Sequence, residues 1–138
     1  MREIRDWISA AQRDLRIGVV EMSRDSATEV ASKAKDRFVS GDPTSWWMAL
    51  RGEYQRVNSK LFSLSMLFPN PATNAYLIPN TEEEELPVYE GSIEDFEKVL
   101  NDCPFFEYCV VATDNSWAVV ESDHNEYFLC GTIRVPVE

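Results

Sequence analysis

The chain has 138 residues, of which 44% are hydrophobic and 12% aromatic, and its net charge is −11. This composition excludes a disordered chain, which is poorer in apolar residues, and a collagen-like chain, which needs far more glycine. No segment approaches the roughly 20 apolar residues that cross a bilayer, and the first residues lack the pattern of a signal peptide. We therefore expect one globular domain over residues 1–138, located in the cytoplasm and not in a membrane.

Helical periodicity predicts two amphipathic helices at the start of the chain. Apolar residues recur every three or four positions over residues 2–15 and again from about residue 23 to residue 39. Ser23 or Ser26 can cap the second of these helices. The β-branched segment between them, residues 17–22, predicts a short strand.

The middle of the chain predicts a series of short elements separated by proline and glycine. A capped helical turn carries the adjacent Trp46 and Trp47, and residues 53–57 are extended. Residues 60–68 are apolar on nearly every side, which predicts a third, buried helix. Residues 75–78 then predict a strand.

The second half predicts one more helix between strands. A short strand is expected at residues 86–89, and Ser92 with Asp95 forms a variant capping box for a helix that Pro104 ends. The order of helices first and strands later indicates an α+β fold, with N-terminal helices followed by a mainly antiparallel sheet and one intervening helix.

From Phe105 onward, the apolar period changes to two, which predicts a C-terminal three-stranded meander. Two-residue turns at residues 114–115 and 124–125 would place Tyr108 opposite Glu121, and Glu121 opposite Phe128. One face is then apolar and forms the core against the helices: Cys109, Val111, Ala118, Val120, Leu129 and Ile133. The other face is aromatic with one carboxylate: Tyr108, Val110, Trp117, Val119, Glu121 and Phe128. We expect the central residues to be largely buried: Val110, Val111, Val119, Val120 and Leu129.

The residues that carry catalysis or bind metals are sparse in this chain. The three cysteines, Cys103, Cys109 and Cys130, have no CxxC spacing and are expected to be reduced thiols, with acidic neighbours raising the pKa of Cys103. The five glycines are isolated, so no phosphate-binding loop is present, and His124 is the only histidine. We therefore expect no catalytic residues, no metal site and no cofactor.

Four segments between Trp46 and Gly131 resemble an uncharacterised family of small bacterial proteins, a domain of unknown function. That family has a tryptophan pair, a VYEG-like segment, an E-Y-Y strand and a W-L-x-C-E-N-H-H-D run that ends in glycine. The corresponding segments here are Trp46 with Trp47, Val88 to Gly91, Phe106 to Cys109, and Trp117 to Gly131. In the last run Glu121 and His124 match, whereas Ser122, Asp123 and Asn125 differ.

The resemblance has implications for function and leaves the first 45 residues unsupported. The family is similar in type to the immunity proteins that bacteria keep beside toxins, which are small, acidic and without catalytic residues. The loss of the first histidine of the pair, where Asp123 stands, argues against any chemistry that needs both histidines.

The charge is concentrated in the second half of the chain, which indicates the kind of partner. Residues 1–69 carry 11 basic and 9 acidic residues, a balance of +2, whereas residues 70–138 carry 2 basic and 15 acidic residues, a balance of −13. Such a field disfavours nucleic acid and anionic membranes and favours a basic protein partner. The sequence is also compatible with a homodimer through an exposed sheet edge or helix face.

Two functions follow as hypotheses. The first is a non-enzymatic, immunity-type inhibitor that binds a basic toxin, with nine residues as candidate contacts: Glu82, Glu83, Glu84, Glu85, Tyr108, Trp117, Glu121, Asp123 and His124. The second is a small hydrolase or ligand-binding domain with a pocket around Glu107, Glu121, Asp123 and His124.

Overall fold

An antiparallel sheet forms the centre of the protein in the computed structural model, which describes residues 4–80 and 87–135. Within these residues the sheet has seven strands in the order β1-β4-β3-β5-β6-β7-β2. The strands are β1 (Val20–Glu21), β2 (Tyr54–Asn58), β3 (Asn74–Pro79), β4 (Tyr89–Ser92), β5 (Tyr108–Ala112), β6 (Trp117–Glu121) and β7 (Glu126–Gly131).

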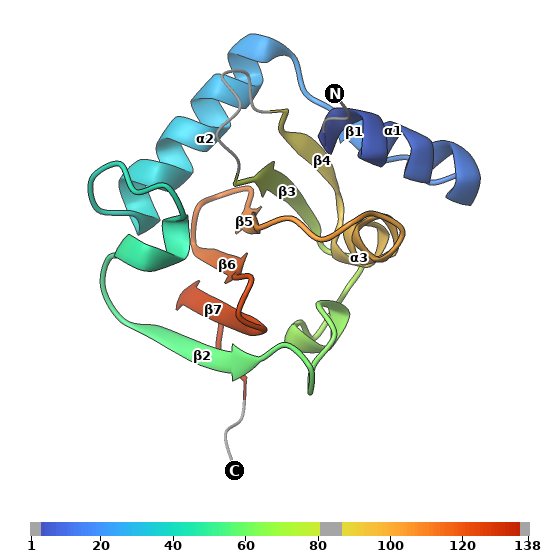
Figure 1. Ribbon diagram of the computed structural model, residues 1–138. Coiled ribbons are helices and arrows are strands. Elements are labelled where there is room, and N and C mark those ends of the chain that lie inside the picture. Colours follow the sequence, from blue (N-terminus) through green and yellow to red (C-terminus); the bar gives the residue numbers. More distant parts are fainter. Residues whose placement is uncertain (1–3, 81–86, 136–138) are drawn as a thin grey trace.

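Three α-helices and two short 3₁₀ turns accompany the sheet in the described ranges (Figure 1): α1 (Ile4–Leu15), α2 (Arg24–Phe38), α3 (Ile93–Asn101), η1 (Trp46–Ala49) and η2 (Ser65–Leu67). The hydroxyl of Ser23 accepts a hydrogen bond from the backbone N–H of Ser26, and that of Ser92 accepts one from Asp95. These two caps satisfy free N–H groups in the first turns of α2 and α3. The predicted α+β fold is confirmed.

The sheet is covered on both faces, because successive side chains of each strand point in opposite directions. Helices α1 and α3 lie on one face, here called the α1–α3 face, where Val110 and Val119 join one hydrophobic cluster (Figure 1). Helix α2 and η1 lie on the other, the α2 face, where Val111 and Val120 join a second cluster. The prediction that only one face of the meander forms the core is wrong, because both faces are buried.

The two hairpins of the meander differ in how well the sequence predicted them. Tyr108 pairs with Glu121 and Val110 with Val119, as expected. In the second hairpin Glu121 pairs with Tyr127, not with Phe128. The N–H of Ser122 bonds the carbonyl of Glu126, so these two residues close a loop of three residues, 123–125. Asn125, the last residue of this loop, adopts a φ of 61°. This shift of one residue exchanges the faces of Phe128 and Leu129.

The predicted third helix over residues 60–68 is not formed, and only η2 is helical there. In an α-helix the backbone N–H of Ser65 would bond the carbonyl of Leu61. Instead it donates to the carboxylate of Glu97 on α3, at 2.9 Å. Leu64 and Leu67 are buried, whereas Leu61 and Met66 are exposed, so the segment is a surface loop anchored by two leucines.

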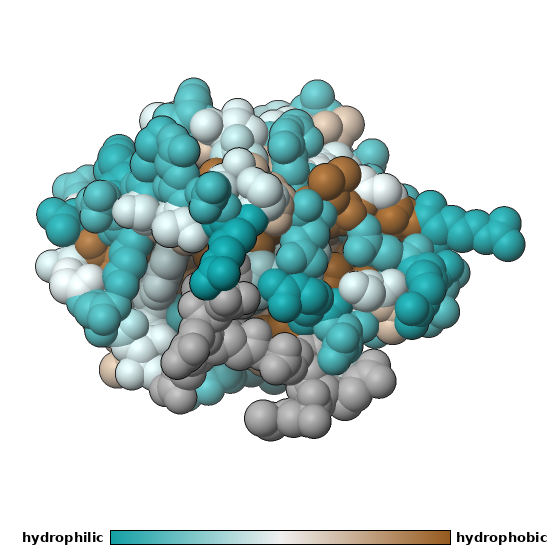
Figure 2. Space-filling view, turned by 90° about the horizontal axis from the view of Figure 1, so that it is seen from above, coloured by the Kyte–Doolittle hydropathy of each residue, from teal (hydrophilic) through white to brown (hydrophobic). Residues whose placement is uncertain are grey.

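Burial in the centre of the sheet agrees with the sequence. All five residues predicted to be buried, Val110, Val111, Val119, Val120 and Leu129, have no exposed surface. From above, the surface is mostly hydrophilic and hydrophobic residues appear in small separate groups (Figure 2). Over residues 4–80 and 87–135, no helix is both long and apolar enough to span a bilayer.

Candidate binding pocket

A pocket of about 620 Å³ opens on the α1–α3 face, between α3, residues 59–66 and the strands β5 to β7. Its floor is a row of three polar side chains, Tyr108, Glu121 and Tyr127, which pair across the three neighbouring strands and therefore point to the same side. Its walls are apolar and include Phe62, Leu64, Leu100 and Phe106. The pocket thus combines one carboxyl group with a largely apolar lining.

A short hydrogen bond joins two of the three floor residues. The hydroxyl of Tyr108 donates to Oε1 of Glu121 at 2.6 Å. Tyr127 lies on the other side of Glu121, its partner across the β6–β7 pairing. Burial raises the pKa of both phenols well above the ordinary tyrosine value, so they stay neutral and polar at physiological pH.

Glu121 is half-buried and has no basic partner among the described residues. Burial raises its pKa above the ordinary value of 4.5, while the hydrogen bonds from Tyr108 and Ser59 act in the opposite direction. None of the ion pairs within the described ranges involves Glu121. A carboxylate in this position is a ready acceptor for a cation that brings its own apolar surface.

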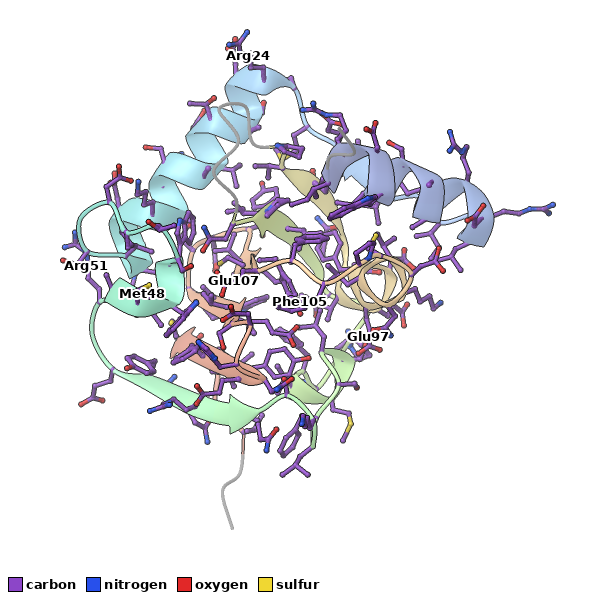
Figure 3. The ribbon with its side chains drawn as sticks, viewed as in Figure 1. Arg24, Met48, Arg51, Glu97, Phe105 and Glu107 are labelled. Atoms are coloured by element: carbon purple, nitrogen blue, oxygen red, sulfur yellow. The ribbon has the colours of Figure 1, made fainter. Side chains whose placement is uncertain are left out.

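Exposed apolar side chains form the rim of the pocket. Leu61, Met66 and Phe105 are 70%, 62% and 55% exposed, respectively. Glu97 holds the η2 part of this rim, because its two oxygens accept hydrogen bonds from the backbone N–H and the hydroxyl of Ser65. Glu97 and Phe105 lie on the α3 side of the sheet in Figure 3.

Cys103 also lines the pocket, as a weakly reactive thiol. Its pKa is raised to about 11, first by burial and then by the charge of Asp102. The predicted direction is therefore confirmed, but burial is the larger cause. Because the thiolate is the nucleophilic form, this environment does not favour a catalytic cysteine.

Glu107 forms a separate structural contact on the α2 face, beside η1 (Figure 3). Its carboxylate accepts hydrogen bonds from the Ser45 hydroxyl and the Trp47 indole, each at 2.7 Å, and from the backbone N–H of Asp123 at 3.1 Å. The Trp47 ring stacks on Phe128 with centroids 5.9 Å apart and meets His124 edge-on at 5.3 Å. These contacts tie η1 to the β6–β7 loop.

The whole described domain falls within one family match. A family model described as a family of unknown function, DUF6756, matches residues 1–136. The chain belongs to DUF6756. No curated protein and no solved structure matches it. The resemblance to an uncharacterised family is thereby confirmed at the level of a domain of unknown function.

The predicted site residues of this DUF6756 chain lie in several places. Tyr108 and Glu121 are on the pocket floor, although Tyr108 is buried, and Trp117 is half-buried against Phe68 with centroids 4.9 Å apart. Asp123 and His124 are exposed in the β6–β7 loop, with Nε2 of His124 3.3 Å from Oδ1 of Asp123. Glu82, Glu83, Glu84 and Glu85 lie outside the described residues.

The four residues of the alternative hypothesis do not share one pocket. Glu121 faces the 620 Å³ pocket, whereas Glu107 bonds the backbone of Asp123 and the Trp47 side chain on the α2 face. His124 lines a separate, smaller hollow of about 340 Å³ beside Arg56. In the part of the DUF6756 chain that the structure describes, no group of three or more His, Cys, Asp or Glu residues could hold a metal ion.

Sequence reasoning missed Tyr127 and the apolar rim. Tyr127 enters the floor only in the three-residue loop register, and the signal for that loop was Asn125, because asparagine tolerates positive φ. The rim residues Leu61 and Met66 were assigned to a buried helix. Their exposure results from the contact between Ser65 and Glu97, which no local pattern reveals.

Proposed function

We propose that this DUF6756 protein is a non-enzymatic, acidic binding protein, an immunity-type inhibitor that acts in the cytoplasm on a basic bacterial toxin. The observation that carries the proposal is the exposed apolar rim of Leu61, Met66 and Phe105 around a pocket whose floor holds a carboxyl group that forms no ion pair with any described residue. The partner would bind over this pocket.

The composition of the rim supports a protein interface. Interface cores are enriched in aromatic residues and methionine and are surrounded by polar groups. Phe105 and Met66 supply the first kind of residue, and Lys60 and Asn101 at the same pocket supply the second. Covering the rim would remove exposed apolar surface from water, which favours binding.

The charge of the chain supports a basic partner. The second half, with a balance of −13, contributes strands β3 to β7 and helix α3, and therefore most of the pocket. A negative field of this size accelerates the encounter with a positively charged protein and does so most strongly at low ionic strength.

The chain offers a matched pair of variants to test the binding face. Met66 in η2 is 62% exposed at the pocket, and Met48 in η1 is 65% exposed on the α2 face. Met66→Asp places a charge in the proposed interface, whereas Met48→Asp makes the same change outside it. The partner to be tested is the product of the open reading frame next to the gene for this chain.

We expect co-expression of the wild-type chain to relieve the growth arrest caused by that toxin, and titration calorimetry to show a direct complex. Met66→Asp should weaken the complex at least about tenfold, because it replaces an apolar contact with a group that must lose its hydration when the partner covers the rim. Met48→Asp should bind and protect like the wild type. A neighbouring product that is harmless, or a toxin equally inhibited by both variants, would contradict the proposal.

The pocket also favours a second candidate, a small hydrolase or ligand-binding domain. Its volume of about 620 Å³ is in the range of small-molecule sites, and Glu121 supplies one fixed polar group. The chemistry would have to use Glu121 without His124, which lines a different hollow. A metabolic operon around the gene, in place of a toxin, would favour this candidate.

A further inference from the structure

We propose that the pocket receives the cationic end of a lysine or arginine side chain of the basic partner, with Glu121 as its anionic contact. This inference rests on the proposed function, since it assigns a ligand chemistry to the same pocket. The side chain would enter past Leu61, Met66 and Phe105 and reach the polar floor.

The pocket has one carboxylate that can accept a cation, that of Glu121. Glu121 is half-buried, accepts a hydrogen bond from Tyr108, and forms no ion pair with any described residue. Glu97, the other carboxylate at the pocket, uses both oxygens to bind Ser65. Lys60 lines the pocket but is exposed and is not ion-paired with Glu121. An incoming cation would therefore find one acceptor that is not ion-paired with any basic residue in the described part of the chain.

The lining selects a cation with an apolar stem over a small inorganic ion. Phe62, Leu100 and Phe106 form walls that an aliphatic chain of three or four methylene groups can contact. The exposed ring of Phe105 offers an aromatic face at the rim, which attracts ammonium and guanidinium groups. A hydrated metal ion would gain nothing from these walls, and only one carboxylate is free to bind it.

A pair of small probes tests this chemistry without the partner. The probes are n-hexylammonium and the neutral n-hexanol, each titrated into the full chain and followed by the backbone amide shifts of residues 59–66 and 103–106. Glu121→Gln keeps the shape of the side chain and an acceptor for Tyr108 but removes the charge. Glu53→Gln removes one charge from an exposed position that does not line the pocket, and is the matched control.

We expect n-hexylammonium to bind the wild type and Glu53→Gln alike, and Glu121→Gln at least about tenfold more weakly, as for the loss of a charged hydrogen bond. The affinity for n-hexanol should be the same in all three proteins. Phe105→Leu, a change at a 55% exposed site that leaves the core intact, should weaken n-hexylammonium binding about two- to fivefold. Equal binding of n-hexylammonium to the wild type and Glu121→Gln would overturn the inference.

The toxin complex separates this inference from the proposed function. If Glu121→Gln binds the toxin as tightly as the wild type does while Met66→Asp does not, the pocket face is correct and the cation contact is wrong. If n-hexylammonium binding depends on Glu121 but no basic protein is inhibited, the cation site stands and its source is a free amine, so the immunity function is wrong.

Discussion

At the scale of single residues, the proposed cation contact depends on Glu121. Its carboxyl lies between two tyrosines, and burial raises its pKa although two hydrogen bonds favour the charged form. The ionised carboxylate of Glu121 is therefore less stable in the folded protein than in water. Such unfavourable burial is commonly found at binding sites, where a ligand relieves it.

This raised pKa predicts a specific dependence of stability on pH. Below the ordinary pKa of 4.5, Glu121 is protonated in both the folded and the unfolded chain, so its ionisation does not change the free energy of unfolding. As the pH rises from there to the higher pKa of the folded state, the unfolded chain releases its proton first. The wild type should therefore lose stability relative to Glu121→Gln across this window, and the difference should then stay constant.

Urea denaturation of the two proteins at a series of pH values from 4 to 7 measures this difference. Glu53→Gln serves as the control for the removal of one exposed glutamate charge. A wild type that gains stability relative to Glu121→Gln over the same window would show a carboxylate stabilised by ionisation, and would contradict the raised pKa.

At the scale of elements, capped helices and the first hairpin could be predicted because their signals are local. Ser23 and Ser92 stand directly before apolar periodic segments, and the β5–β6 register follows from alternation around a short polar turn. The β6–β7 register could not be predicted in the same way, because one more loop residue moves every side chain of β7 to the other face. The helix predicted over residues 60–68 does not form, because the backbone N–H of Ser65 donates its hydrogen bond to Glu97, which is distant in the sequence.

The end of β7 offers a test of this register. Gly131 has a φ of +77° and faces Ser116 and Trp117, so that a Cβ atom there would meet the backbone oxygen of Ser116 and lie 3.0 Å from Cα of Trp117. Gly131→Ala should destabilise the protein by about 2 to 5 kcal/mol, from backbone strain and overpacking together. Thermal or urea unfolding measures this loss.

Gly41→Ala separates the two causes. Gly41 has a similar φ of +72°, but nothing lies within 4 Å of its would-be Cβ. Gly41→Ala should therefore lower the free energy of unfolding by only about 1 to 2 kcal/mol, the cost of a left-handed conformation for alanine. Equal losses at the two glycines would indicate that β7 does not approach Ser116 as described.

At the scale of the whole molecule, the sheet has a core on each face, which the composition permitted but the sequence pattern did not reveal. Both sides of β5 and β6 are apolar, as in a strand buried on two faces, whereas only one side was predicted to form the core against helices. The site could be predicted only in part for the same reason. Glu121 and Tyr108 were identified, but the helix and loop that enclose them into a pocket come from distant parts of the chain.

The central claim is that a basic partner binds over this pocket, and amide hydrogen exchange of the complex tests it most directly. In the complex with the neighbouring toxin, exchange should slow in residues 59–66 and 103–106, which carry Leu61, Met66 and Phe105. Exchange in η1, on the α2 face, should not change. Protection in η1 and α2, with residues 59–66 and 103–106 unchanged, would contradict the account.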